Sequence, residues 1–184
     1  MALWIVESRM LRGYKQMNNF YPTLYVMVGC PGSGKSYFTE FFPNFRGTNT
    51  EVVSRDKIRF SMLSLGDNYF KNEKKVFKRF ISDINRKLES GLDVVADATH
   101  ISKASRSKLL SNICNKEKLN IVAIVINTPL EECIKRNKNR VGLQLVPENV
   151  IVKMHSKMEV PTIDEGFEDV WVINYTNSYQ KHNY

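Results

Sequence analysis

The residues with the clearest chemical pattern lie between positions 29 and 36. They read Gly29-Cys30-Pro31-Gly32-Ser33-Gly34-Lys35-Ser36, a complete G-x-x-x-x-G-K-[ST] sequence. In such a loop the glycines let backbone N–H groups close around a phosphate, and the following helix adds the positive end of its dipole. Lys35 can reach the β- and γ-phosphates, and Ser36 can ligate Mg²⁺. The flanks oppose a chance glycine-rich turn, because the apolar run 23–28 predicts a buried strand and 37–42 can continue as a helix.

A second polar group follows the short strand predicted at 50–53. A carboxylate at Asp56 would face the phosphates, where it can accept the proton of an attacking hydroxyl. Arg59 lies three residues further, on the same helical face, and is suited to hold a phosphate or carboxylate of an acceptor by a bidentate contact. The alternative is structural: Asp56 caps a helix, and Arg59 is a surface charge.

Asp97 ends the strand predicted at 92–96, as in a Walker B strand, where an acid helps to hold Mg²⁺ directly or through water. It could instead orient Arg59 or cap the next helix. We expect His100, close by, to be structural or to contact substrate, because the sequence offers it no metal partner.

Two arginines, Arg136 and Arg140, are spaced four residues apart at the end of a predicted helix, hence on one face. Arginines on a closing lid neutralise charge on a phosphoryl group in transfer, and 141–146 would be the mobile hinge of that lid. The alternative is that they are cations placed favourably at a helix C-terminus.

Alternating strands and helices must position these residues. The pattern predicts an α/β fold, with a parallel sheet of about five strands and helices on both faces. Since ligands bind at the carboxyl ends of such strands, one shared site is expected. Residues 1–22 are predicted to be an extension, loosely attached or forming a short helix, before a single domain at 23–184. The expected strands are 23–28, 50–53, 92–96, 120–126 (central, because it is the most apolar) and 170–173, and the expected helices are 73–90, 102–118, 129–139 with a capping box at 128–131, and 147–160.

Composition narrows the functional class. The chain has 184 residues, of which 42% are hydrophobic and 25% charged, as in an ordinary globular domain. No apolar run approaches the roughly 20 residues of a membrane span, and the first residues do not form a signal peptide. Three unpaired cysteines indicate a reducing compartment, here the cytoplasm, with no disulfide framework or zinc site.

The net charge of +8 favours a nucleic-acid partner but does not require one. The lysines near the start of the helix at 73–90 are either a solvated face or a nucleic-acid track: Lys71, Lys74, Lys75 and Lys78.

Four blocks together resemble the 5′-kinase domain of the phage T4-type polynucleotide kinase family and its bacterial relatives in RNA repair. The resemblance covers roughly 23–160, and its blocks are Val28 to Ser36, Ser54-Arg55-Asp56-Lys57-Ile58-Arg59, Asp97-Ala98-Thr99, and Lys135-Arg136-Asn137 through Val146-Pro147. Where the family often has Asp-Thr-Asn, this chain has Asp97-Ala98-Thr99-His100. Too few residues follow Val160 for a phosphatase domain, so healing of 3′ phosphates is not expected.

The resemblance implies a P-loop kinase fold with a helical lid at about 136–160, and it implies ATP or another nucleoside triphosphate and Mg²⁺ as cofactors. Nucleic acid 5′ ends would be the substrate, with Asp56 as general base for the 5′-hydroxyl and Arg59 on the phosphate just 3′ of the acceptor nucleoside. Asp97 would support Arg59 and the metal site, and Val146 would pack on the acceptor base. Arg136 and Arg140 would be the lid arginines, and 29–36 would bind the triphosphate.

Two rival functions use the same loop. A small-molecule kinase, similar to zeta-toxin, gluconate or nucleoside kinases, would have a closed, neutral acceptor pocket. A regulatory ATPase would position water in place of an acceptor. The sequence does not decide between DNA and RNA, or the oligomeric state.

Overall fold

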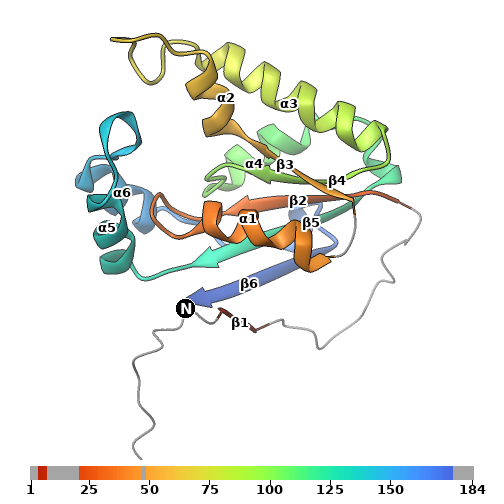
Figure 1. Cartoon of the computed structure of the whole chain (residues 1–184). Helices are drawn as coiled ribbons and strands as arrows, with labels where there is room; N and C mark the ends of the chain where they lie inside the picture. The colour runs from red at the N-terminus through yellow and green to blue at the C-terminus, as the bar shows by residue number, and fades with distance from the viewer. Residues whose placement is uncertain (1–3, 8–20, 47–48, 176–184) are drawn as a thin grey trace, which may run out of the picture.

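A computed structural model describes residues 4–7, 21–46 and 49–175. Its centre is a six-stranded sheet in the order β1-β6-β5-β2-β4-β3 (Figure 1). Five of these strands run parallel, as predicted, and β5 lies inside the sheet. The strands are β1 Trp4–Glu7, β2 Thr23–Val28, β3 Thr50–Ser54, β4 Asp93–Asp97, β5 Asn120–Asn127 and β6 Asp169–Tyr175.

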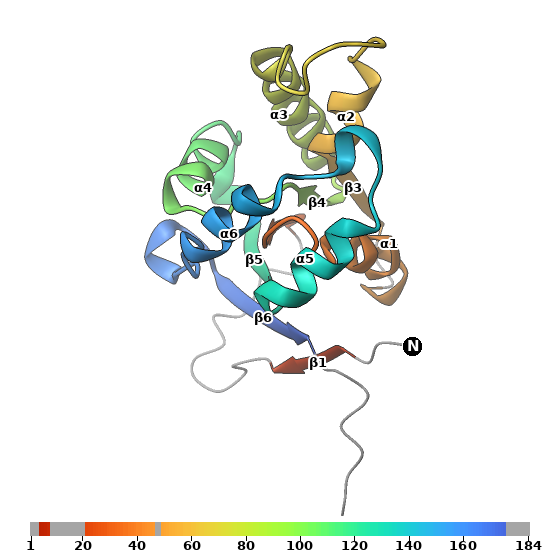
Figure 2. The ribbon, with the colours of Figure 1, turned by 90° about the vertical axis from the view of Figure 1, so that its left-hand side faces the viewer.

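Helices cover both faces of the sheet. Figure 2 shows α1 and α4 on opposite sides of it, while α5 and α6 lie at the end where the parallel strands terminate. Three short 3-10 helices complete the described chain: Lys116–Lys118, Gly142–Gln144 and Ile163–Glu165. The α-helices are α1 Lys35–Arg46, α2 Arg55–Ser61, α3 Glu73–Glu89, α4 Lys103–Leu110, α5 Leu130–Lys138 and α6 Glu148–Ser156.

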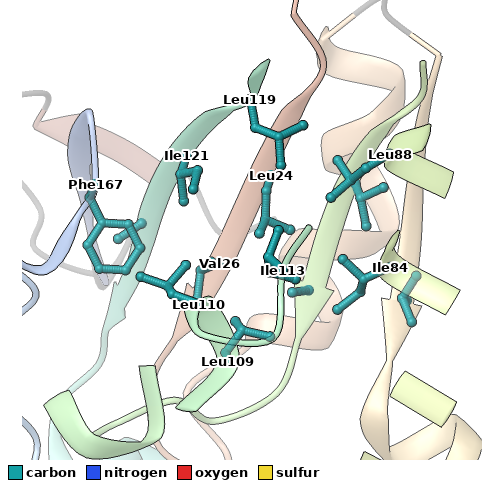
Figure 3. Close-up of a cluster of buried hydrophobic side chains, with 14 of the residues drawn as sticks. Leu24, Val26, Ile84, Leu88, Leu109, Leu110, Ile113, Leu119, Ile121 and Phe167 are labelled. Atoms are coloured by element: carbon teal, nitrogen blue, oxygen red, sulfur yellow. The ribbon is translucent and has the colours of Figure 1, made fainter. Parts of the chain in front are cut away.

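The side chains of β2 alternate between two hydrophobic clusters, one on each face of the sheet. Leu24 and Val26 join α3 and α4 residues in the larger cluster, which Figure 3 shows. Tyr25 and Met27 point to the other face, where Phe42 of α1 packs. Because both faces of β2 are buried, its apolar run is continuous, as in parallel sheets generally. This packing fixes the end of β2 from which the phosphate loop starts.

Two predicted helices are shorter than the sequence indicated. The helix expected at 102–118 ends at Leu110, because the side chain of Asn112 donates to the carbonyl of Lys108 and Asn115 takes a left-handed conformation (φ 50°). The helix expected at 147–160 ends at Ser156, since the backbone N–H of Glu159 bonds instead to the carbonyl of Ile101 at 2.8 Å. Both ends were decided by polar contacts that hydrophobic periodicity does not encode.

Two further predictions were wrong in detail. The capping box at 128–131 does not form: Pro129 precedes α5, and the Thr128 hydroxyl donates to the carbonyl of Ser33 at 2.8 Å. The extension was not expected to contain a strand, yet β1 pairs antiparallel with β6. Residues 8–20 lie outside the described residues, so the extension at 1–22 and the domain at 23–184 stay a prediction.

Candidate active site

The phosphate loop connects β2 to α1 at the carboxyl end of the sheet, as predicted. In Figure 2 it lies between α5 and α6 on one side and α2 and α3 on the other. The loop is tied down at its start, where the Gly29 N–H donates to the carbonyl of Thr99 at 3.0 Å. At its turn, Ser33 N–H donates to the carbonyl of Cys30 at 3.1 Å. The loop is therefore preformed through backbone contacts.

Gly32 is required by the packing of the loop against α5. Its φ is +81°, a left-handed conformation that favours glycine. A Cβ atom there would overlap the backbone carbonyl of Cys133, which cannot move aside as a flexible side chain could. The loop and α5 thus approach each other backbone to backbone, above a small buried cluster of Cys30, Cys133 and Ile151.

Lys35 is buried at the start of α1 and faces acidic groups. Its ammonium donates to the carbonyls of Gly29 and Cys30, both at 2.8 Å. Burial lowers the pKa of Lys35, and the charge of Asp97 opposes that change. Burial likewise raises the pKa of Asp97, with Lys35 as the largest opposing influence. The two side chains therefore stabilise each other's charge, in the place where a phosphate would lie.

The oxygen donors Ser36 and Asp97 fit Mg²⁺. Asp97 pairs with Ser54 in the register of β4 and β3, so its carboxylate sits at the carboxyl edge of the sheet with the loop. No group of three or more metal-binding side chains occurs among the described residues. Mg²⁺ commonly binds through one or two protein oxygens plus substrate phosphates, so this donor set suits a metal that arrives with a nucleotide.

Asp56 and Arg59 both lie on α2, and they contact each other. Ser54, and not Asp56, caps α2 by accepting from the Lys57 N–H, so the capping alternative for Asp56 is wrong. The Asp56 carboxylate accepts from Arg59 and remains 66% exposed, whereas the Arg59 side chain is 6% exposed. Arg59 is therefore no surface charge. Burial lowers the pKa of Lys35, and Asp56 is close enough to oppose that change slightly.

Tyr69 and Glu73 complete this group, and the sequence analysis missed both. The Tyr69 hydroxyl donates to Asp56 and accepts from Arg59, each at 2.8 Å. Burial, followed by the charge of Asp56, raises the pKa of Tyr69 to about 12, so it stays a donor. Glu73 accepts from Arg59 at 2.9 Å and also from Arg55. No local pattern could have suggested this cluster, because Tyr69 and Glu73 lie 10 and 14 residues from Arg59 along the chain.

The two arginines predicted to lie on a lid are placed differently from each other. Arg136 lies on α5 and donates to the carbonyl of Ser33 at 3.1 Å and to Glu132 at 2.9 Å. Its guanidinium also lies 4.7 Å from the ring centre of Tyr175. Arg140 follows the end of α5, so the two do not share one helical face as predicted. Arg140 is still close enough to lower the pKa of Lys35.

Asn137, which lies between these arginines in the sequence, is buried and joins the two ends of the segment 137–146. Its side-chain amide donates to the carbonyl of Val146 at 2.7 Å, and its oxygen accepts the Val146 N–H at 3.1 Å. The segment that carries Arg140 is thus a loop with joined ends. Val146 packs against the cluster of Cys30 and Ile151 beneath the phosphate loop. A contact of Val146 with an acceptor base stays a prediction.

His100 is structural in its contacts. Its Nδ1 donates to the carbonyl of Met27 at 3.1 Å, and its ring lies 6.1 Å from that of Phe80. Burial lowers its pKa to about 4, so the ring is neutral near pH 7. It therefore links β2, the strand before the phosphate loop, to α3.

Comparison with known proteins now identifies the family. Residues 24–161 match the AAA_33 family model, described as an AAA domain, and the chain belongs to this family. It is 30% identical over 146 residues to L-seryl-tRNA(Sec) kinase of Methanococcus maripaludis, an alignment that covers 75% of this chain and 53% of that protein.

Solved structures agree with this assignment. A chain in the Pnkp1/Rnl/Hen1 RNA repair complex matches with a TM-score of 0.64 and 27% identity, covering 79% of this chain and 46% of that one. A gluconokinase from Sinorhizobium meliloti shares the fold, with a TM-score of 0.53 and 18% identity, and the match covers 85% of each chain. The chain thus spans about half the length of the first two relatives. The fold, the loop and these relatives place the chain among P-loop kinase domains, whose loop is of the kind that holds the phosphates of a nucleotide. None of the helices in the described ranges has the length and apolar character needed to cross a membrane.

Proposed function

We propose that this kinase is an ATP-dependent polynucleotide 5′-hydroxyl kinase with Mg²⁺ as its metal. The observation that carries the proposal is the contact between Asp56 and Arg59 beside Lys35. A carboxylate that can take a proton adjoins a guanidinium that can bind a phosphate. The acceptor that this pair suits carries a hydroxyl close to a phosphodiester, as the 5′ end of a nucleic acid does.

The relatives and the charge support the same acceptor. Two of the compared proteins are named for RNA: one belongs to an RNA repair complex, and the other is a kinase of seryl-tRNA(Sec). The net charge of +8 favours a polyanionic substrate. Three free cysteines suit a reducing compartment, and we place the protein in the cytoplasm.

In the proposed reaction, the acceptor oxygen forms a bond to the γ-phosphorus while the bond from that phosphorus to the β–γ bridging oxygen breaks. Asp56 accepts the hydroxyl proton, and ADP leaves. Lys35 stabilises the charge on the transferring group, and Arg140 adds a second cation from the lid. Ser36 and Asp97 would hold Mg²⁺, which would further neutralise the charge of the phosphate oxygens.

In this proposal Arg59 exchanges a partner when the acceptor binds. Its Nη1 donates to Asp56 and Tyr69 and its Nη2 to Glu73, while Nε has no partner among the described residues. A phosphate that replaces the Asp56 carboxylate on Arg59 would free Asp56 for the acceptor hydroxyl. Acceptor binding would thus switch on the base, which limits transfer of phosphate to water.

A second candidate acceptor is a hydroxyl on the aminoacyl group of a tRNA, favoured by the 30% identity with the seryl-tRNA(Sec) kinase. One experiment separates the candidates. The full chain is incubated with γ-labelled ATP and Mg²⁺, together with 5′-hydroxyl RNA or DNA, seryl-tRNA, gluconate or no acceptor. Label on the 5′ end is the expected result. Label on seryl-tRNA or gluconate alone, or release of labelled phosphate alone, would overturn the proposal.

A further inference from the structure

An exposed aromatic ring lies next to the acceptor residues. Phe70 is in the segment that joins α2 to α3, and it is 65% exposed, although a phenylalanine ring gains by burial. Its neighbour Tyr69 meets it edge to face, with ring centres 4.9 Å apart and an angle of 88°. Phe60 in turn lies 6.0 Å from Tyr69. The three rings form a short row that ends in the open face of Phe70.

This aromatic row is connected to Asp56 by contact. Tyr69 donates to the Asp56 carboxylate at 2.8 Å, and its other neighbour is the Phe70 ring. The Arg59 guanidinium lies 4.3 Å from the Tyr69 ring centre and 5.9 Å from that of Phe70. A nucleic acid whose 5′-hydroxyl reaches Asp56 therefore passes Phe70 within its first nucleotides.

The surface around Phe70 is basic. Lys71 follows it directly and pairs with Asp67 at 2.7 Å. Lys74 and Lys75, on the first turn of α3, are exposed, and within the described ranges neither forms a salt bridge. Exposed rings beside cations match the chemistry of a single strand, because bases stack on the rings while phosphates contact the lysines.

We infer that Phe70 stacks with a base near the 5′ end of a single-stranded acceptor and that Lys74 and Lys75 bind the phosphates that follow. This inference rests on the proposed function and names the form of its substrate, a single strand with unpaired bases. It also assigns the segment 62–72 as the acceptor platform. Base pairing would hide the face that Phe70 needs, so a recessed 5′ end in a duplex should bind less well.

Binding is measured first, because it does not depend on catalysis. Phe70→Trp places a fluorophore at the stacking position, and a 5′-hydroxyl oligonucleotide should quench it beyond the change seen in wild type, whose tryptophans are Trp4 and Trp171. The same strand with abasic sites at its first three positions should quench it far less. Equal quenching by both strands, or none, would overturn the inference.

Transfer is measured second. Phe70→Ala should lower kcat/KM for the oligonucleotide about 5- to 150-fold, the range of one stacked base, whereas Phe70→Trp should retain it. On the abasic strand Phe70→Ala and wild type should be equal. If wild type labels oligonucleotides and Phe70→Ala has the same kcat/KM on both strands, the stacking role of Phe70 is refuted. The kinase assignment would remain intact. A wild type that labels no oligonucleotide would refute the kinase assignment, and the fluorescence titration would still decide the platform.

The lysines are tested by salt dependence. Lys74→Glu with Lys75→Glu should reduce the slope of log affinity against log salt, because two phosphate contacts that release counterions are lost. The matched control is Lys116→Glu with Lys118→Glu, which makes the same charge change just before the amino end of β5, away from the site. Equal slopes for the two double variants would show that Lys74 and Lys75 are solvent-exposed residues that do not bind the nucleic acid. If Phe70 instead binds a protein partner, the Phe70→Trp fluorescence should not respond to any oligonucleotide.

Discussion

The phosphate loop holds its shape through backbone groups, whereas the proposed acceptor side of the site is held by side chains. In the loop, Gly29 and Cys30 supply carbonyls to the Lys35 ammonium, and each distance is 2.8 Å. On the acceptor side, Asp56 is 66% exposed and depends for its position on bonds to other side chains, among them Arg59. One half of the site is held by bonds to backbone carbonyls, and the other by bonds between side chains, which can exchange partners.

This difference separates what all such kinases share from what distinguishes them. Backbone N–H groups recognise any triphosphate and vary little with side-chain identity. Side-chain networks change with single substitutions, so they can adapt to one acceptor. Variants of the loop should therefore weaken every reaction of ATP, while variants of the acceptor network should weaken only transfer to the acceptor.

The largest effect is expected from Lys35→Ala. Loss of the buried ammonium should lower kcat by about 10²–10³ or more and also weaken ATP binding, because the cation contacts the nucleotide itself. Labelled transfer and nucleotide titration measure the two effects. Lys118→Ala, a lysine far from the loop, is the control. Turnover within a few fold of wild type would show that the loop does not act as described.

Asp56→Ala tests the other half of the comparison. Transfer to the acceptor should fall by about 10²–10⁴, the usual contribution of a general base, while affinity for ATP stays the same. The control is Asp164→Ala, which removes an exposed acid from the 3-10 helix Ile163–Glu165. If Asp56→Ala turned over at a near-normal rate, the assignment of the base would be wrong.

Arg59→Ala should remove the preference of wild type for a nucleoside 3′-phosphate over a nucleoside as acceptor. A lost charge-assisted contact is worth about 1.5–3 kcal/mol, or about 10- to 150-fold in kcat/KM. Arg59→Lys keeps the positive charge but loses the planar guanidinium that binds phosphate through two N–H groups, so it should retain little of the preference. ATP affinity should not change in either variant. A wild type without any preference would point to a small-molecule acceptor.

The smallest effect at neutral pH is expected at His100, which links the two halves. Its folded pKa of about 4 lies below the usual 6.5, so the unfolded chain binds the extra proton first as pH falls. The stability from His100 is therefore complete above about pH 6.5 and is lost progressively down to about pH 4, by about 3 kcal/mol in the free energy of unfolding.

Urea unfolding between pH 4 and 7.5 measures this loss. Carboxylates also titrate in that range, so the matched variant is His100→Gln, which cannot protonate. The decrease in unfolding free energy from pH 6.5 to pH 4.5 should be smaller in His100→Gln than in wild type. Parallel curves for the two proteins would show that His100 does not carry the change.

Much of the nucleotide half could be predicted from the sequence, because its parts are contiguous. The loop at 29–36 contains its glycines, Lys35 and Ser36 in one stretch, and the apolar strands before Asp56 and Asp97 placed those acids at the same sheet edge. Local pattern was enough there, since the period of a strand and the position of glycine follow directly from covalent geometry.

The acceptor half and the lid needed the tertiary structure. Tyr69 bonds to Asp56 across thirteen residues, and no local pattern marks a tyrosine in a loop as a partner of an acid. The bonds of the Asn137 side chain to the backbone of Val146, which join the ends of the loop carrying Arg140, were also not visible in the local sequence. The sequence by itself determined the sheet and the phosphate loop, because these follow from hydrophobic period and glycine geometry. Only the tertiary structure decided which polar groups meet, because that depends on how segments pack in three dimensions.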